Sequence, residues 1–281
     1  MLGIIGGTGL YKIDGINKVR SKKVDTPYGS PSSEITIGEL SGKTIAFLPR
    51  HGSQHQILPS EINFRANIWA LKSVGVRQII GVSAVGSLRE EIRPGDLVLP
   101  NQYLDWTKGK RHGTFFGDGV VAHVSTANPT CNSLAIKIQK NAKALEFKIH
   151  TDKTYACVEG PRLGTRAESL YLRNNGCDLV GMTNVPEAFL AREAQICYCT
   201  IAVATDYDCW LDDPSQHAAV DKVIELYQKN IGRVKVLLQK VIADGAESLK
   251  CECRTALKYA LLTSQEVLTP DQKHNLKFLL D

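Results

Sequence analysis

The 281-residue chain contains no apolar run long enough to span a membrane, and residues 1–7 show no feature of a signal peptide. Its lysines and arginines are spread along the chain, without a basic cluster or an aromatic RNA-binding motif. The formal net charge of +5 therefore fits small anionic molecules better than nucleic acid. We expect a soluble cytoplasmic protein that binds neither nucleic acid nor a membrane.

Eight cysteines are many for this length, but their spacing does not match a usual metal site. Cys251 and Cys253 form a tight Cys-Glu-Cys pair, whereas zinc sites usually need two such pairs with wider spacing, and no second pair follows. We therefore expect no metal, and disulfides would be unusual in a mesophile's cytoplasm. The other cysteines lie in apolar surroundings, where free cysteine acts as a small core residue: Cys131, Cys157, Cys177, Cys197, Cys199 and Cys209.

Strand and helix patterns alternate along the chain, and apolar residues make up 43% of it, enough for a sizeable core. We predict one α/β domain over residues 1–245, with a central mixed sheet flanked by helices, and a C-terminal helical tail over 246–281 packed on or between subunits. The predicted strands cover 2–10, 22–25, 33–40, 43–48, 78–82, 96–100, 152–158, 178–182 and 196–205. The predicted helices cover 64–74, 133–145, 165–174, 188–194 and most of 213–244.

Several of these strands end in residues suited to an anionic ligand. The first runs into a glycine turn around Thr8, where backbone amides and a hydroxyl can surround an anion. A dinucleotide fingerprint is excluded there, because position 12 is lysine instead of a third glycine. Arg50 and His51 follow another strand, and Ser83 and Ala84 follow a third.

The longest buried-strand pattern, residues 196–205, delivers Asp206 and Asp208 at its carboxyl end. Ligands of α/β proteins bind at that end of the strands. Period-two spacing puts both carboxylates on one side if the chain is still extended, where they can hold a proton or bind adjacent donors of a planar ligand. Capping of the next helix is the simpler alternative. Because several strands end in suitable residues, we favour one composite site.

Taken together, the motifs resemble the trimeric purine nucleoside phosphorylases, within them the S-methyl-5′-thioadenosine phosphorylase branch, over nearly the whole chain through Ala243. The implied fold is nucleoside phosphorylase-like. The matching motifs appear in order as Gly6-Gly7-Thr8-Gly9-Leu10, Thr26-Pro27-Tyr28-Gly29, Pro49-Arg50-His51-Gly52, Asn67-Ile68-Trp69-Ala70-Leu71, Ser83-Ala84-Val85-Gly86-Ser87-Leu88, Glu159-Gly160-Pro161-Arg162, Gly181-Met182-Thr183 with Val185-Pro186-Glu187, and Ala204-Thr205-Asp206-Tyr207-Asp208.

The resemblance implies phosphorolysis, in which phosphate attacks the anomeric carbon while the bond to purine nitrogen 9 breaks, without a cofactor or metal. It implies that Met182 contacts the ribose hydroxyls, that Asp206 lies near purine nitrogen 7 and that Asp208 accepts from the 6-amino group. Catalysis would rest on Asp206, Asp208 and His51. Phosphate contacts are implied for Thr8, Arg50, His51, Ser83, the Ala84 backbone and Thr183, and Thr183 closes on the sugar as well. An apolar wall around the 5′-methylthio group is implied for Val220, Val223 and Ile224.

The resemblance also implies a homotrimer or a dimer of trimers, in which His123 reaches the neighbouring subunit's site. The sequence departs from the family at Leu163, where an aromatic usually stacks beside the purine, and at Gly164, where serine is common. A sister group acting on methylthioinosine shares this leucine, but it carries asparagine at the position of Asp206. A preference for 6-oxopurine nucleosides such as methylthioinosine or inosine is therefore one alternative. A nucleotide-binding module on a degenerate phosphorylase fold is the other.

Further expectations concern residues near these motifs. We expect His55 to be structural or to lie at the rim of the site, and Trp69 to lie in the core. We expect Arg162, Arg166 and Glu168 to form a structural ion network instead of binding ligand.

Overall fold

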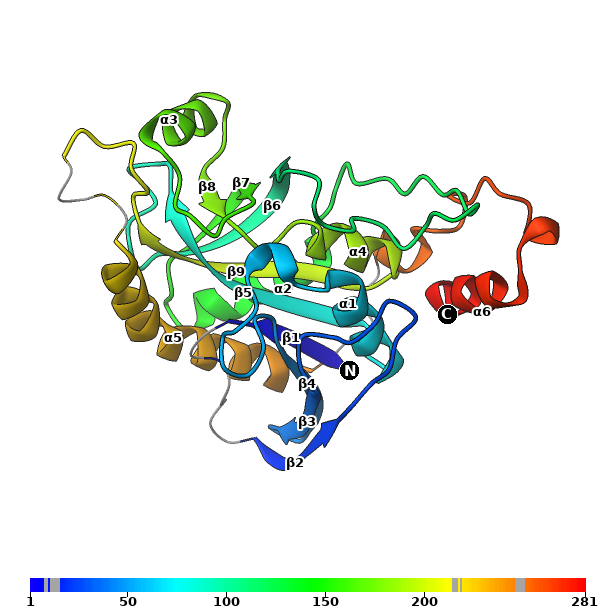
Figure 1. The fold of residues 1–281 in the computed structure, drawn as a ribbon. Helices are drawn as coiled ribbons and strands as arrows, with labels where there is room; N and C mark the ends of the chain where they lie inside the picture. The colour runs from blue at the N-terminus through cyan, green and yellow to red at the C-terminus, as the bar shows by residue number, and fades with distance from the viewer. Residues whose placement is uncertain (8–9, 11–15, 214–216, 218, 246–250) are drawn as a thin grey trace.

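The computed structural model describes residues 1–7, 10, 16–213, 217, 219–245 and 251–281. In these residues one mixed sheet of nine strands forms the centre of the molecule (Figure 1). Its strands are β1 (Leu2–Gly6), β2 (Asn17–Lys22), β3 (Ile35–Leu40), β4 (Lys43–Pro49), β5 (Gln78–Ser87), β6 (Leu97–Trp106), β7 (Ile149–Val158), β8 (Leu179–Gly181) and β9 (Cys197–Asp206). The prediction of a single α/β domain with a mixed sheet is thus confirmed.

The order of the strands is β2-β3-β4-β1-β5-β8-β7-β6-β9, and β5 pairs with β9 as well. This additional pairing closes β5, β8, β7, β6 and β9 into a ring. The strands β1, β4, β5 and β9 are connected by parallel pairings, from β4 through β1 and β5 to β9, so their carboxyl ends lie at one edge of the sheet. Residues that follow these strands therefore meet at that edge.

Helices cover the sheet on both faces (Figure 1). The longer helices are α1 (Phe64–Ser73), α2 (Asn132–Ala144), α3 (Arg166–Asn174), α4 (Glu187–Glu193), α5 (Val220–Ala243) and α6 (Pro270–Leu280), with 3₁₀ turns η1 (Pro59–Glu61), η3 (Glu252–Thr255) and η4 (Gln265–Val267). Side chains of α2 and α5 share one apolar cluster with β9, and side chains of α1 and α4 share another with β1 and β4. The strand β9 is buried along nine of its ten residues, which explains why its sequence is continuously apolar.

The helix α5 shows how the sequence pattern produces this packing. Its apolar residues recur at the spacing of one helical face, and Tyr227, Ile231, Val234, Leu238 and Val241 are all buried. The predicted helix over 213–244 is therefore found, but it begins only at Val220. No helix among the described residues combines the length and apolarity that crossing a membrane requires.

Some predicted boundaries were wrong for identifiable reasons. The strand predicted over 78–82 is too short: β5 continues to Ser87, because the small residues after Val82 pair with β9 and β8. The strand predicted over 22–25 lies earlier, as β2. Part of the predicted first strand and glycine turn, including Thr8, lies outside the described residues.

The C-terminal segment packs against its own chain. Lys72 Nζ donates to the Leu279 carbonyl over 3.1 Å, and Gln195 Nε2 donates to the Leu280 carbonyl over 2.7 Å. The ring of Phe278 lies 4.0 Å from the ring of Trp69, which is buried as predicted. These contacts hold α6 beside α1 and the end of α4.

Candidate active site

A cavity of about 640 Å³ opens where β4, β5, β8 and β9 end. This volume is in the range of small-molecule sites. The cavity collects most of the predicted site residues: Arg50, His51, Ser83, Ala84, Leu163, Met182, Thr183, Asp206, Asp208, Val220, Val223 and Ile224. Residues as far apart in the sequence as Arg50 and Ile224 thus line one space, as the composite-site hypothesis requires.

Arg50 lies at one end of the cavity and is held by a buried ion pair. Its Nε and Nη2 donate to the two carboxylate oxygens of Glu187 over 2.6 and 2.7 Å, and its Nη1 donates to the Val82 carbonyl over 2.9 Å. Burial alone would lower the pKa of Arg50, but the adjacent charge of Glu187 and their hydrogen bonds raise it above its usual value. Because a guanidinium has five N–H groups, two remain for an anion in the cavity.

His51 is neutral in this setting. Its Nδ1 lies 2.9 Å from the Ile57 carbonyl, which can only accept, so Nδ1 carries the ring proton. Burial lowers the pKa of His51 to about 4, and the charge of Arg50 adds to the effect. The Nε2 atom is therefore an acceptor, suited to a hydroxyl of substrate or of protonated phosphate.

The two aspartates line the cavity where β9 ends, and the strands β1 and β5 lie between β9 and the strand β4 that leads to Arg50. Burial raises the pKa of Asp206 above its usual range, and the charge of Asp208 acts in the same direction. The pKa of Asp208 is also raised, first by burial. The backbone N–H of Asp208 donates to Asp206 Oδ1 over 2.7 Å, and the left-handed conformation of Asp208, with φ of 52°, aids this local turn.

The hydroxyl group of Thr205 contacts both Asp206 and a backbone carbonyl, so its hydrogen bonds depend on whether Asp206 is protonated. Its Oγ1 lies 2.7 Å from Asp206 Oδ2 and 3.2 Å from the Val85 carbonyl oxygen. One hydroxyl proton cannot serve both acceptors. When Thr205 donates to Val85, only a protonated Asp206 can supply the proton for the shorter contact. The geometry thus accommodates Asp206 both as a carboxylate and as a proton donor.

Apolar side chains form the wall between the helix α5 and the loop after β7. Val220 and Ile224 are 61% and 47% exposed, although both line the cavity, and Leu163 is 40% exposed. Apolar groups left open to water in a cavity favour an apolar group of a ligand. Tyr227 and Gln228 lie on the same side and were not predicted.

A buried arginine positions the segment that carries Met182 and Thr183. Arg111 Nη1 donates to the Met182 and Val185 carbonyls over 2.7 Å each, and its Nε donates to Glu159 over 2.9 Å. Little in the sequence indicated this role, because Arg111 lies in a long polar segment far from its partners. Glu187 was missed for the same reason, since only the fold brings it to Arg50.

The remaining predictions have mixed outcomes. His123 does not line the cavity of its own chain. Its backbone N–H donates to the Ala260 carbonyl over 2.8 Å, and the reach of its side chain to a neighbouring subunit stays a prediction. His55 lines the cavity and is exposed, at the rim as expected, with its ring 4.5 Å from that of His51. Arg162 pairs with Glu168 over 2.7 Å as predicted, whereas Arg166 pairs with Asp212, so the expected network is two separate ion pairs.

Comparisons with known proteins agree on one family. The family model described as the phosphorylase superfamily matches residues 1–243. The S-methyl-5′-thioadenosine phosphorylase of Geobacter sulfurreducens is 45% identical over 280 residues, covering 100% of this chain and 98% of that protein.

Solved structures give the same result. A methylthioadenosine phosphorylase from an antarctic soil metagenomic library superposes with a TM-score of 0.93 at 45% identity, covering 100% of this chain and 98% of that one. The methylthioadenosine phosphorylase of Schistosoma mansoni, in complex with adenine, superposes with a TM-score of 0.87 at 34% identity, covering 95% of this chain and 99% of that one.

Proposed function

The chain belongs to the phosphorylase superfamily, and we propose that it catalyses the phosphorolysis of S-methyl-5′-thioadenosine. Phosphate and the nucleoside are converted to adenine and 5-methylthioribose 1-phosphate, a step in methionine and purine salvage. One observation carries this proposal: a single cavity joins donors for an anion, two carboxyl groups of raised pKa and an apolar wall. Relatives that match this chain over nearly its whole length are named for this activity.

Phosphate binds at the end formed by Arg50, His51, Ser83, the Ala84 backbone and Thr183. The remaining N–H groups of Arg50 bind its oxygens, and Nε2 of the neutral His51 accepts a hydrogen bond from a phosphate hydroxyl. Because Glu187 fixes the guanidinium, little side-chain entropy is lost when phosphate binds. Phosphate held in this way attacks the anomeric carbon from the face opposite the purine.

The leaving purine develops negative charge as the glycosidic bond breaks. Asp206, protonated, donates to nitrogen 7 and neutralises this charge, while Asp208 accepts from the 6-amino group. The raised pKa of Asp206 supports this role, because a carboxyl group ionised far below neutral pH could not hold the proton. Met182 contacts the ribose hydroxyls between the two ends.

The 5′-methylthio group lies against Val220, Val223 and Ile224, where a 5′-hydroxyl would find few polar partners. The 6-oxopurine alternative is not favoured, because two carboxyl groups suit a 6-amino base and the relatives are named for methylthioadenosine. The nucleotide-binding alternative would require the reactive residues to be degenerate, whereas Arg50, His51, Asp206 and Asp208 line one cavity.

Base release from methylthioadenosine tests the proposal, with methylthioinosine and inosine measured in parallel. We expect adenine to be released fast and only when phosphate is present. A preference for the 6-oxo substrates would reject the assigned specificity. Absence of turnover of all three would favour the nucleotide-binding module.

We further infer that the enzyme is a cytoplasmic homotrimer or dimer of trimers. His123 would complete the neighbouring subunit's site, and the tail over 246–281 would pack on or between subunits. Sedimentation velocity of the wild-type protein would determine the oligomeric state. A monomer with full activity would refute the shared site.

A further inference from the structure

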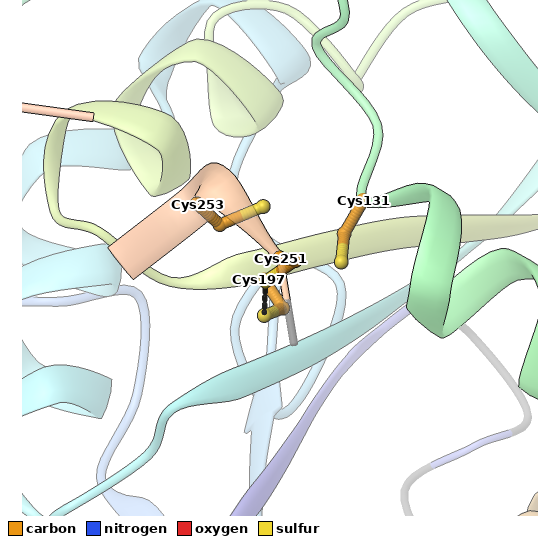
Figure 2. A group of neighbouring side chains, drawn as sticks. All are labelled: Cys131, Cys197, Cys251 and Cys253. Carbon is orange, nitrogen blue, oxygen red and sulfur yellow. Dashed lines mark hydrogen bonds between the residues drawn. The ribbon is translucent and has the colours of Figure 1, made fainter. Parts of the chain in front are cut away.

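Four cysteines from three separate parts of the chain lie together (Figure 2), and none of them lines the active-site cavity. Cys131 is the N-cap residue of α2, Cys197 is the first residue of β9, and Cys251 and Cys253 lie at the 3₁₀ turn η3. Their four Sγ atoms all lie within 4.8 Å of one another. Neither the sequence spacing nor the proposed reaction accounts for this group.

We propose that these four cysteines bind one zinc ion in tetrahedral coordination. A zinc–sulfur bond of about 2.3 Å sets the sulfur–sulfur edge of a tetrahedral site at about 3.8 Å. The observed separations surround this value, since Cys197 Sγ and Cys251 Sγ are 3.3 Å apart and no pair exceeds 4.8 Å. Four sulfur ligands in tetrahedral arrangement favour zinc over the hard cations that prefer oxygen.

The expectation of no metal came from spacing along the chain, where no second pair follows Cys251 and Cys253. In the structure the other two ligands come earlier in the chain and are far apart in sequence: Cys131 caps α2, and Cys197 begins β9. The N–H of Cys131 donates to the Tyr198 carbonyl over 2.8 Å, which fixes the helix cap beside the strand. The fold therefore assembles the four-cysteine group that the local sequence does not show.

One cationic side chain contacts the group: Arg192 Nη1 donates to Cys253 Sγ over 3.3 Å, and its charge favours a thiolate there. Cys131 lies at the N-terminus of α2, whose dipole is positive at that end. Zinc with four thiolates carries a net charge of −2, which Arg192 partly offsets. Each thiol that binds the ion loses its proton to solvent, so no electron is transferred and no oxidant is required.

A path for the ion exists at the surface. Cys131, Cys251 and Cys253 line a pocket of about 460 Å³ together with Arg192 and Asn128. Pairing of the same sulfurs as disulfides would need an oxidant that the proposed reaction does not supply. Bound zinc would join residues 251–281 to β9 and α2, and its role would be structural. The inference is independent of the phosphorylase activity.

Metal analysis of the full chain, purified without chelators, tests the zinc site. We expect about one zinc per chain, because structural sites use four protein ligands for each ion. Cys131→Ala and Cys253→Ala should each reduce zinc to background. Cys177→Ala is the matched control: it also removes a buried cysteine, but from a different apolar cluster, and it should retain zinc.

Reconstitution of the wild-type protein with metal tests the site even if the cysteine variants do not fold. Wild-type protein stripped of metal should take up one equivalent of Co²⁺ and show the intense visible absorption of tetrahedral thiolate coordination, which Zn²⁺ then removes. All eight cysteines should react as thiols after denaturation with a chelator. Zinc-free protein that binds no Co²⁺, or fewer than eight reactive thiols without reductant, would overturn the proposal; the latter would indicate disulfides.

Discussion

Replacing Asp206 by asparagine separates proton donation from every other property of this side chain. The amide group introduced by Asp206→Asn has the shape of a protonated carboxyl group. Its oxygen can accept the N–H of Asp208, and its NH₂ can donate to Thr205 Oγ1 while Thr205 donates to Val85. The variant can also donate a hydrogen bond to purine nitrogen 7, but it cannot transfer a proton.

The magnitude follows from that difference. Loss of a general acid typically costs about 10²–10⁴ in rate, equivalent to about 3–5 kcal/mol of transition-state stabilisation. The free energy of unfolding of Asp206→Asn should not fall along with its rate of catalysis. The folded protein raises the pKa of Asp206, so the stability that this group contributes is present at low pH and is lost as pH rises through the raised pKa. At neutral pH the variant should unfold no more easily than the wild type.

The assay measures adenine release at saturating phosphate across a pH series. The kcat of the wild type should fall as pH rises through the pKa of Asp206, and this fall should be absent in Asp206→Asn. In Asp206→Asn the turnover of methylthioinosine should fall less than the turnover of methylthioadenosine, because an amide suits a 6-oxo base. Asp212→Asn is the control, since the Asp212 side chain is 96% exposed and does not line the cavity.

The KM for phosphate should stay within about threefold, because Asp206 ends β9, which β1 and β5 separate from the strand β4 that leads to Arg50. Unchanged kcat in Asp206→Asn would refute the assigned role. A fall in kcat accompanied by an equal loss in Asp212→Asn, or by unfolding, would refute the structural reasoning.

Three other changes test the remaining parts of the site. Glu187→Ala should lower the free energy of unfolding in urea by about 3–5 kcal/mol, because it leaves the buried Arg50 without its partner; a loss below about 1 kcal/mol would contradict this. Burial lowers the pKa of His51 from 6.5 to about 4, so the free energy of unfolding of the wild type should fall as pH drops through this interval. In a parallel series of unfolding measurements, His51→Gln should lose less stability over the same interval. Val223→Asn should reduce kcat/KM for methylthioadenosine relative to adenosine by about tenfold, and an unchanged ratio of the two would argue against the apolar 5′ wall.

Much of the fold follows from local sequence patterns. The continuous apolar run at 196–205 predicted β9, because a strand buried on both faces is apolar throughout. The helical spacing of Val220, Val223, Ile224 and Tyr227 predicted α5. Boundaries were less predictable. The strand β5 continues through small residues such as Ser83 and Gly86, and only its pairing with β9 shows that they are part of the sheet.

The candidate site was also predictable only in part: the sequence indicated its residues but not their ionisation. Arg50, His51, Asp206 and Asp208 were predictable, because polar side chains directly after buried strands must meet at one edge of a parallel arrangement. Their ionisation was not predictable, because it depends on burial and on partners far away in sequence. Glu187 fixes Arg50, and the Ile57 carbonyl fixes the proton of His51.

The sequence alone therefore determined which elements form and which side chains stand at their ends, since hydrophobic period and strand polarity are local properties. Only the tertiary structure decided which distant groups meet. It joined Arg111 to the Met182 carbonyl, and it gathered Cys131, Cys197, Cys251 and Cys253 within 4.8 Å. Contacts of this kind depend on strand order and helix packing, which no local pattern in the chain encodes.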